Sequence, residues 1–432
     1  MIKRIHFIGI GGIGVSSLTQ YYLAQKAIVS GSDLEKSEIT DYLKKKGAKI
    51  FIGNKKEDIH QDLDLVIYTP AVGKDNPELK QAKRLKIKTL SYPEALGLLT
   101  KKHFTIAVSG AHGKSTTTAM LAKILIEAKL DPTVIIGTKL KEFGDTNFRA
   151  GSKNILLIEA DEFQASFLNY WPKIIIVTNI EAEHLDYYKN LNNVLKAFKK
   201  FVSHLGAKGI LIANQDNENV LKIAKGIKKT IFYSFNQKKA ALLKLKVPGS
   251  YNISNALAAL YCARALKIPD KVSFKALSEY RGAWRRMETH QAKLKGRNIT
   301  VISDYGHHPT EIAVTISAIK EKYHGKGIWL IFQPHQYQRT FYLFNDFVRA
   351  LNGLGIEKIL LAPIYGVAGR ETQALIQKIS SEKLASKIAM ATAMTDFKTI
   401  EKYILDKFDK DLLVFMGAGD IYLLAQRFFK NR

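Results

Sequence analysis

The sequence predicts an α/β protein built from several domains with largely parallel sheets. Short apolar runs alternate with helix-like patterns along the whole chain, and polar or Gly-rich turns directly follow several of these runs. The chain has 432 residues, and a typical size of roughly 100–200 residues per domain then allows two to four domains. Hydrophobic residues make up 46% of the chain, which is enough for sizeable cores and argues against a largely disordered protein.

The chain carries a strong positive charge. Its 66 Lys and Arg residues against 39 acids give a formal net charge of +27, and such a charge attracts polyanions of any kind. The basic residues are scattered singly or in short groups such as Lys44–Lys46, without a dense basic tail or a strip of interleaved aromatic residues. We interpret this pattern as a solvated, Lys-rich surface and predict no nucleic-acid partner.

Features that would indicate secretion or a membrane are missing from the sequence pattern. The single cysteine, Cys262, lies in an apolar helical stretch, so a disulfide within the chain is excluded and a cysteine-based zinc site is disfavoured. The N-terminal segment reads as a strand entering a turn and not as a signal peptide. Apolar runs such as Ile155–Ile158 are far shorter than a membrane span. We therefore expect a cytoplasmic protein with no membrane insertion.

The first block covers residues 1–102 and opens on a strand and a Gly-rich turn. The pattern G-x-G-x-x-G lies between this strand and a helix, where glycines let the backbone approach a pyrophosphate at the helix N-terminus. Asp33, at the end of the second strand, is placed to reach a ribose or base hydroxyl. The block therefore predicts a diphosphate nucleotide without specifying NAD. The motif glycines are Gly9, Gly11, Gly12 and Gly14. The expected strands are Ile5–Ile10, Ala27–Gly31, Ala48–Phe51 and Leu65–Tyr68, and the expected helices are Ile13–Gln25, Ile39–Lys46 and Tyr92–Leu99.

The second block, residues 103–284, contains a phosphate-binding loop between a strand and a helix. Backbone N–H groups of such a loop cradle phosphates, Lys114 can reach the terminal phosphates, and the Ser115 hydroxyl can ligate Mg²⁺. Only two residues separate its glycines, against four in the common loop, so this form is more specific. The loop predicts ATP binding through Gly110, Ala111, His112, Gly113, Lys114, Ser115 and Thr116. The expected strands are Phe104–Val108, Ile155–Glu159, Ile174–Thr178 and Gly209–Ala213, and the expected helices are Ser115–Ala128, Leu191–Leu205, Asn252–Leu266 and Lys271–Tyr280.

Further polar groups follow the strands of this block. The acids Glu159–Glu162 come directly after a strand beside the phosphate loop, a place that suits Mg²⁺. His184 could ligate a second metal or orient a carboxylate, although a single histidine is usually structural. Asn252 and Asn255 are three residues apart at a helix start, so they share one face. One of them could be an ordinary N-cap, or the pair could recognise an adenine edge.

The third block, residues 285–432, begins at a possible hinge. Arg285 and Arg286 lie between the second and third blocks, where an arginine can bind phosphate when the domains close. Polar segments follow two of its strands, at Asp304–Glu311 and Gln333–Thr340. The expected strands are Ile299–Asp304, Gly327–Phe332, Lys358–Ala362 and Leu412–Met416, and the expected helices are Pro309–Tyr323, Thr340–Leu351 and Ile421–Lys430.

The order of these motifs resembles the Mur ligase family over essentially the whole chain. The segments that carry the likeness are GIGGIG with SGSD, SGAHGKSTTTAM, EADE with ASF, TNIEAEHLD, DYGHHPTE, FQPHQYQRT and MGAGD. The likeness is strongest to the members that join L-alanine to UDP-N-acetylmuramate. It implies a three-domain α/β architecture: an N-terminal Rossmann-like domain for the UDP-sugar, a central P-loop ATPase domain, and a C-terminal Rossmann-like domain for the amino acid.

The resemblance also implies an activity and a role for each motif. We expect ligation with ATP and Mg²⁺ through an acyl phosphate, in peptidoglycan precursor synthesis, by a monomer or weak homodimer that binds only small molecules. The implied catalytic residues are Lys114, Glu159, His184 and His307. The implied metal ligands are Ser115, Glu159 and His184. The UDP-sugar is expected at Gly9, Gly11, Gly12, Gly14 and Asp33, ATP at the phosphate loop with Asn252, Asn255, Arg286 and Asp304, and the amino acid at Tyr305, His307 and Arg339.

Three departures from the family pattern leave part of this reading open. Gln336 stands where the family usually has an arginine that would pair with the amino-acid carboxylate, so L-alanine, glycine and L-serine all stay possible. Phe163 and Gln164 replace a small and an acidic residue. The short stretch at 235–248 predicts a trimmed central domain. A ligase that attaches an intact tripeptide and a catalytically silent nucleotide-sugar-binding protein are the alternatives. A P-loop nucleic-acid motor is disfavoured by the absence of a basic groove in the sequence pattern.

Overall fold

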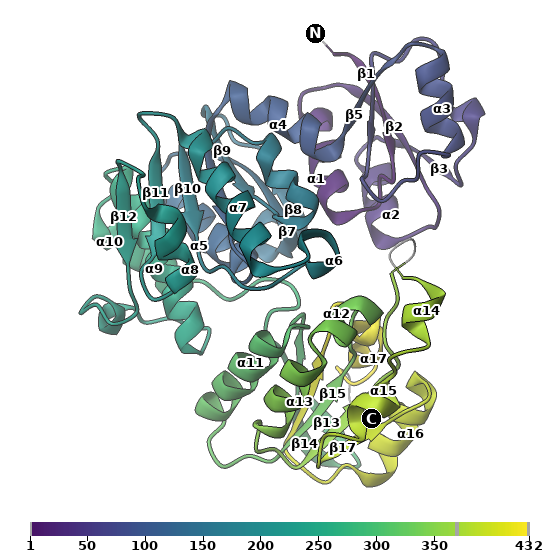
Figure 1. Cartoon of the computed structure of the whole chain (residues 1–432), viewed down its shortest axis with the longest axis vertical. Helices are drawn as coiled ribbons and strands as arrows, with labels where there is room; N and C mark the ends of the chain where they lie inside the picture. The colour runs from purple at the N-terminus through teal and green to yellow at the C-terminus, as the bar shows by residue number, and fades with distance from the viewer. Residues whose placement is uncertain (1, 368–370, 430–432) are drawn as a thin grey trace. The chain divides into compact units, whose positions relative to one another are not determined.

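The computed structural model describes residues 2–367 and 371–429. It contains three mainly parallel sheets of five, seven and six strands, one in each of the three sequence blocks (Figure 1). The chain divides into two compact units, and each is described by itself. The first unit comprises residues 1–183, 190–244 and 254–280, and the second comprises residues 184–189, 245–253 and 281–432.

The first sheet is parallel throughout, in the order β3-β2-β1-β4-β5. Helices cover both of its faces, so residues Ile5–Ile8 of β1 are buried. Phe7 packs toward Tyr22 of α1, while Ile8 joins Leu79 of α3 in a core on the opposite face. The strands are β1 Arg4–Ile8, β2 Ile28–Asp33, β3 Lys49–Ile52, β4 Leu65–Tyr68 and β5 Lys88–Ser91, and the helices are α1 Ile13–Ala24, α2 Glu38–Lys45, η1 Lys56–Asp58, α3 Pro77–Arg84 and α4 Tyr92–Lys102.

The second sheet has the order β12-β11-β10-β6-β9-β7-β8, with β7 and β8 antiparallel and the other neighbours parallel. Helix α5 is buried along most of its length. Residues 235–248 contain the short helix η5 Ala240–Leu242. The strands are β6 Phe104–Ser109, β7 Thr133–Leu140, β8 Thr146–Arg149, β9 Ile155–Glu159, β10 Ile174–Val177, β11 Ile210–Asn214 and β12 Thr230–Tyr233. The helices are α5 Lys114–Glu127, η2 Lys141–Phe143, η3 Phe163–Asn169, α6 Leu185–Tyr188, α7 Leu191–Val202, η4 Ser203–Leu205, α8 Glu218–Ala224, α9 Ser250–Ala265 and α10 Asp270–Ser278.

The third sheet has the order β13-β14-β18-β15-β16-β17, and an antiparallel strand, β13, occupies one edge. Its two faces carry separate apolar cores, one around Phe347 and the other around Phe415. The strands are β13 Glu288–Leu294, β14 Arg297–Asp304, β15 Ile328–Phe332, β16 Lys358–Leu361, β17 Ala391–Ala393 and β18 Leu412–Met416. The helices are α11 Pro309–Lys322, α12 Tyr337–Tyr342, α13 Phe344–Asn352, α14 Gln373–Ile376, α15 Ser381–Ala385, α16 Phe397–Lys407 and α17 Ile421–Gln426.

The expected α/β class and every expected strand position are confirmed, but several helix limits were wrong. The helix expected over Thr340–Leu351 is two helices, α12 and α13, separated at Leu343. Apolar periodicity continues across this break, so the pattern does not reveal it. The expected helix Leu191–Leu205 ends as α7 at Val202 and continues as a 3₁₀ turn, and α17 ends at Gln426, with Lys430 outside the described residues.

Across residues 2–367 and 371–429, none of the helices is both long enough and apolar enough to cross a membrane.

Candidate active site

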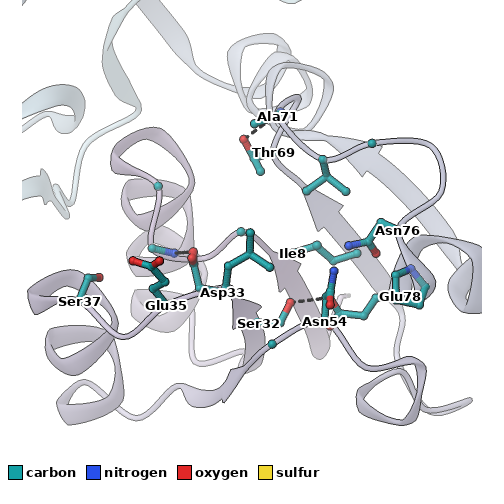
Figure 2. A pocket seen from close by; sticks show the side chains of 18 of the residues that line it. Ile8, Ser32, Asp33, Glu35, Ser37, Asn54, Thr69, Ala71, Asn76 and Glu78 are labelled. Atoms are coloured by element: carbon teal, nitrogen blue, oxygen red, sulfur yellow. Dashed lines mark hydrogen bonds between the residues drawn. The ribbon is translucent and has the colours of Figure 1, made fainter. Parts of the chain in front are cut away.

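A cavity of about 640 Å³ opens beside the carboxyl ends of the strands of the first sheet. It is lined by the turn after β1, the segment Ser32–Ser37 after β2, and the segment Ala71–Glu78 that leads into α3. Figure 2 shows Asp33, Asn54 and Thr69 around this pocket, on segments that follow three different strands. Ligands of open parallel sheets bind at this edge, so the pocket lies where the sequence predicts the nucleotide.

The Gly-rich turn is held in place by Asp33. Its carboxylate Oδ2 accepts a hydrogen bond from the backbone N–H of Gly11 at 2.8 Å. Gly9 has a φ of +77°, and an added Cβ there would lie 2.4 Å from Thr69 Cγ2, so a side chain is excluded. Gly9, Gly11, Gly12 and Asp33 all line the pocket. Gly14 lies inside α1, where an added Cβ would meet the Tyr92 ring at 3.1 Å, so this glycine allows close packing.

A buried polar chain beneath the pocket was not anticipated from the sequence. The imidazole Nε2 of His6 lies 3.1 Å from Glu78 Oε1. The Ser32 hydroxyl donates to Glu78 Oε2 at 2.7 Å (Figure 2). His6 and Glu78 are both fully buried. These contacts link the start of α3, which lines the pocket, to β1 and β2.

The phosphate loop runs from the end of β6 into α5. Gly110 and Gly113 have φ values of +139° and +80°. An added Cβ would lie 2.1 Å from Thr178 Oγ1 at Gly110 and 2.3 Å from Asn255 Oδ1 at Gly113. Glycine is therefore required at both positions for conformation as well as for space.

Residues that directly follow β10 form hydrogen bonds with the backbone of the phosphate loop. The backbone N–H of His112 donates to Asn179 Oδ1 at 2.8 Å, and the Thr178 hydroxyl donates to the His112 carbonyl at 2.6 Å. The His112 imidazole pairs with Glu181 at 3.4 Å. The sequence segment TNIEAEHLD therefore supports the loop through residues other than its histidine.

Lys114 is held by the loop and by acids that follow β9. Its ammonium donates to the Gly110 carbonyl at 2.6 Å and to Glu162 Oε2 at 2.9 Å. Burial alone would lower the pKa of this ammonium, but the attraction of Glu162, Asp161 and Glu159 raises it above its ordinary value. Lys114 is consequently a fixed positive charge at the end of the sheet.

Glu159 joins the phosphate loop to β7. Its Oε1 accepts from the Ser115 hydroxyl at 2.9 Å, and its Oε2 accepts from the Gly137 N–H at 2.8 Å. Burial raises the pKa of this carboxyl, while Lys114 acts in the opposite direction. A carboxylate beside a hydroxyl supplies the oxygen ligands that Mg²⁺ prefers, so Ser115 and Glu159 fit this ion.

Two other predicted residues belong to the second unit. His184 has a φ of +54° and directly precedes α6, which packs against α12. Asn252 is buried near the start of α9, and its amide donates to the Pro248 carbonyl at 2.7 Å. Asn255 lies one turn further along α9, beside Gly113. The two asparagines therefore share one buried helix face, as their spacing predicts.

The segment before β13 and the end of β14 form a polar cluster in the second unit. Asp304 is buried and accepts from the backbone N–H groups of Met287 at 2.8 Å and Gly306 at 2.7 Å. Burial raises the pKa of the Asp304 carboxyl, and Arg286 acts in the opposite direction. Arg286 also pairs with Glu311 at 3.5 Å. The neighbouring Arg285 is buried and donates to the Gly417 carbonyl at 2.6 Å.

Tyr305, His307 and Arg339 are connected through His335. The rings of Tyr305 and His307 meet edge to face with centroids 5.4 Å apart, and the His307 and His335 centroids lie 5.5 Å apart. Arg339 Nη1 donates to the His335 carbonyl at 3.2 Å. Gln336 is buried at the start of α12 with a φ of +70°. The predicted amino-acid-binding residues therefore lie in one cluster.

Comparison with known proteins agrees with this arrangement. Three family models match along the chain: "Mur ligase family, catalytic domain" at residues 4–104, "Mur ligase middle domain" at 108–244, and "Mur ligase, glutamate ligase domain" at 285–419. The chain belongs to the Mur ligase family, and it is an ATP-dependent ligase.

Within that family, the similar curated proteins are UDP-N-acetylmuramate–L-alanine ligases. The protein of Clostridium botulinum is 38% identical, with 99% of this chain and 97% of that one covered. The protein of Aquifex aeolicus is 39% identical, with 100% and 98% covered. The crystal structure of the Thermotoga maritima UDP-N-acetylmuramate–alanine ligase matches with a TM-score of 0.80 and 29% identity, over 99% of this chain and 98% of that one.

Proposed function

We propose that this protein joins L-alanine to the carboxylate of UDP-N-acetylmuramate at the expense of ATP, in the synthesis of peptidoglycan precursors. The observation that carries the proposal is the partly buried Lys114 in a glycine-bounded phosphate loop, with Ser115 and Glu159 paired beside it. Full-length similarity to L-alanine ligases supports this choice of substrates.

The pocket of the first sheet is the proposed site of the UDP-sugar. Gly9, Gly11 and Gly12 keep side chains out of the turn, so a diphosphate can approach the N-terminal end of α1, where it is stabilised. Asp33 keeps the turn in shape through Gly11 and can accept from a hydroxyl group of the nucleotide. Gly14 supports the site through its packing against Tyr92.

ATP is assigned to the phosphate loop and to polar residues on three other segments. Residues Gly110–Thr116 bind the phosphates, and Asn252 and Asn255 face the adenine. Arg286 binds phosphate, and Asp304 accepts from the ribose. By likeness to the family, we assign Ser115, Glu159 and His184 as residues that would hold Mg²⁺, and the bound ion would stabilise the negative charge on the transferred phosphoryl group.

The chemistry proceeds in two steps. A carboxylate is a poor acylating agent because its leaving oxygen is strongly basic, so it first attacks the γ-phosphorus of ATP and forms an acyl phosphate and ADP. Lys114, held as a positive charge by its neighbours, stabilises the phosphoryl group in this step. The amine of L-alanine then attacks the acyl carbon, and the tetrahedral adduct collapses to the amide and inorganic phosphate.

The amino acid is assigned to the cluster of Tyr305, His307 and Arg339. The attacking amine must be neutral, so a base has to accept a proton, and His307 is the proposed base. Its ring Nδ1 lies 3.0 Å from the Tyr305 carbonyl, which orients the imidazole. Arg339 offers a guanidinium for the carboxylate of the amino acid.

We further propose the division of the chain into a UDP-sugar domain at residues 1–102, an ATP-binding domain at 103–284 and an amino-acid domain at 285–432. The protein is placed in the cytoplasm, where its small-molecule substrates are made. It acts as a monomer or weak homodimer without a nucleic-acid partner.

The proposed function is tested by phosphate release from purified protein with Mg-ATP and UDP-N-acetylmuramate. L-alanine, glycine, L-serine and the intact tripeptide with a free N-terminal amine are supplied separately. Release with L-alanine, accompanied by formation of the alanyl product, is the expected result. Release with the tripeptide alone would assign the protein to the recycling ligases. If no phosphate were released with any of these acceptors, the proposal that the protein is a ligase acting on UDP-N-acetylmuramate would be contradicted.

Asp33→Ala is expected to raise KM for UDP-N-acetylmuramate by about tenfold or more, since the Gly-rich turn loses a charge-assisted hydrogen bond. The KM for ATP should change little, because Asp33 acts on the sugar-nucleotide pocket. Asp62→Ala is the control, because Asp62 forms an exposed ion pair with Arg4 in the same domain. Steady-state kinetics with each substrate varied in turn measure both effects, and an unchanged KM for the sugar nucleotide would contradict this role.

A further inference from the structure

The contacts of the Lys114 ammonium account for all of its hydrogen-bonding capacity. The ammonium has three N–H donors. It donates to the carbonyls of Gly110 and Ala111 at 2.6 and 3.3 Å, and to the two carboxylate oxygens of Glu162 at 2.9 and 3.2 Å. A phosphate oxygen that contacts Lys114 must therefore replace one of these partners.

Glu162 is the charged member of this set of partners, and the proposed reaction gives it no direct part in catalysis or substrate binding. Its side chain is 2% exposed, and that of Lys114 is 14% exposed, so water screens their attraction weakly. Asp161 lies next to it in sequence but is 57% exposed, with its Oδ1 3.9 Å from the ammonium. The two adjacent acids thus differ sharply in how they interact with the lysine.

Negative charges outnumber positive ones among the groups that act on Lys114, and a bound nucleotide would add further negative charge. Glu162, Asp161 and Glu159 all act on the ammonium electrostatically, so a single positive charge faces three carboxylates. If Lys114 turned toward a triphosphate, Glu162 would become a buried carboxylate without its cation, close to a polyanion. Such an arrangement is costly unless another positive charge arrives.

We propose that Glu162 competes with nucleotide phosphate for Lys114, so that this carboxylate makes tight nucleotide binding depend on a divalent cation. The inference rests on the proposed function, because it takes Lys114 as the phosphate-binding lysine. Glu162 acts through Lys114 and is a positioning residue. Its effect is to weaken the binding of metal-free nucleotide and to favour the magnesium complex that the reaction requires.

The test measures the affinity of the full-length protein for ADP and for a non-hydrolysable ATP analogue by titration calorimetry, in EDTA and in excess Mg²⁺. Glu162→Gln removes the charge but keeps an oxygen that can accept from Lys114. In EDTA this variant is expected to bind both nucleotides about tenfold more tightly than the wild type. In excess Mg²⁺ the difference should shrink or reverse, so the variant shows a smaller dependence on the metal.

Asp161→Asn is the matched control, because it removes one negative charge from the neighbouring, exposed position. Its metal-free affinity should change by less than about threefold, as expected for a screened charge. Glu162→Ala is the second variant, and circular dichroism verifies that each protein is folded. Metal-free affinity that is unchanged or weaker in the folded Glu162 variants would overturn the inference. If Lys114→Ala bound nucleotide as tightly as the wild type, the proposed phosphate site itself would fail.

Discussion

Replacing Lys114 by alanine is expected to lower kcat for phosphate release by about 10³-fold or more, because the variant lacks the positive charge that we propose stabilises the transferred phosphoryl group. The change also leaves Glu162 buried without its cation, so the free energy of unfolding should fall by about 3–5 kcal/mol. Phosphate release is therefore measured well below the midpoint of thermal unfolding of the variant. Calorimetric unfolding of both proteins supplies that midpoint.

Lys123→Ala provides the control for this prediction. Lys123 lies on the same helix, α5, but its partner Glu279 is 48% exposed and 3.5 Å away. A screened surface pair of this kind contributes at most about 1 kcal/mol. The control should keep its activity and most of its stability. Activity of folded Lys114→Ala within about tenfold of the wild type would be inconsistent with a phosphoryl-stabilising role.

Much of the fold could be predicted because parallel strands buried on both faces leave a strong pattern. β10 and β18 are continuous apolar runs, and β1 and β6 are apolar runs interrupted by polar residues; each was located to within a few residues. Elements with weaker patterns were missed. β7 and β8 form a hairpin with an irregular register, and the short edge strand β17 contains only three residues.

The motif residues were predictable where local sequence determines the geometry. The loop from Gly110 to Lys114 must turn between a strand and a helix, so its glycines and its lysine can be read directly from the sequence. Glu159 was also found, because it ends a strand next to this loop. The pairing of Asn255 with Gly113 depends on tertiary packing, although the spacing of Asn252 and Asn255 indicated their common face.

Contacts between residues distant in the sequence could not be predicted from the pattern. His6 lies within an apolar strand, and nothing near it identifies Glu78, 72 residues away, as its partner. Glu162 belongs to the acidic segment that the sequence analysis identified, but the sequence pattern does not distinguish it from Glu159 and Asp161 in the same segment. Only the folded chain distinguishes the acid that binds Ser115 from the acid that binds Lys114.

Glu159→Gln is expected to reduce kcat by about 10³-fold while leaving the fold intact, because it removes the charge of the proposed metal ligand and keeps the size of the side chain. The amide oxygen can accept from the Gly137 N–H, and the amide N–H can donate to the Ser115 hydroxyl. The glutamine can thus form a hydrogen bond with each of the two existing partners, so no buried polar group should lose its partner. Phosphate release at saturating substrates and across a range of Mg²⁺ concentrations measures the loss.

The same variant separates the contribution of Glu159 to metal binding from its contribution to stability. Burial disfavours the charged form of this carboxyl, as its raised pKa shows, so a neutral amide should be tolerated at least as well without metal. In EDTA the variant should unfold at the same temperature as the wild type or above it. Added Mg²⁺ with ADP should stabilise the wild type through linkage and stabilise the variant much less. Equal stabilisation of both proteins would show that Mg²⁺ binds without Glu159, and the carboxylate would then act on the phosphate loop through Ser115 alone.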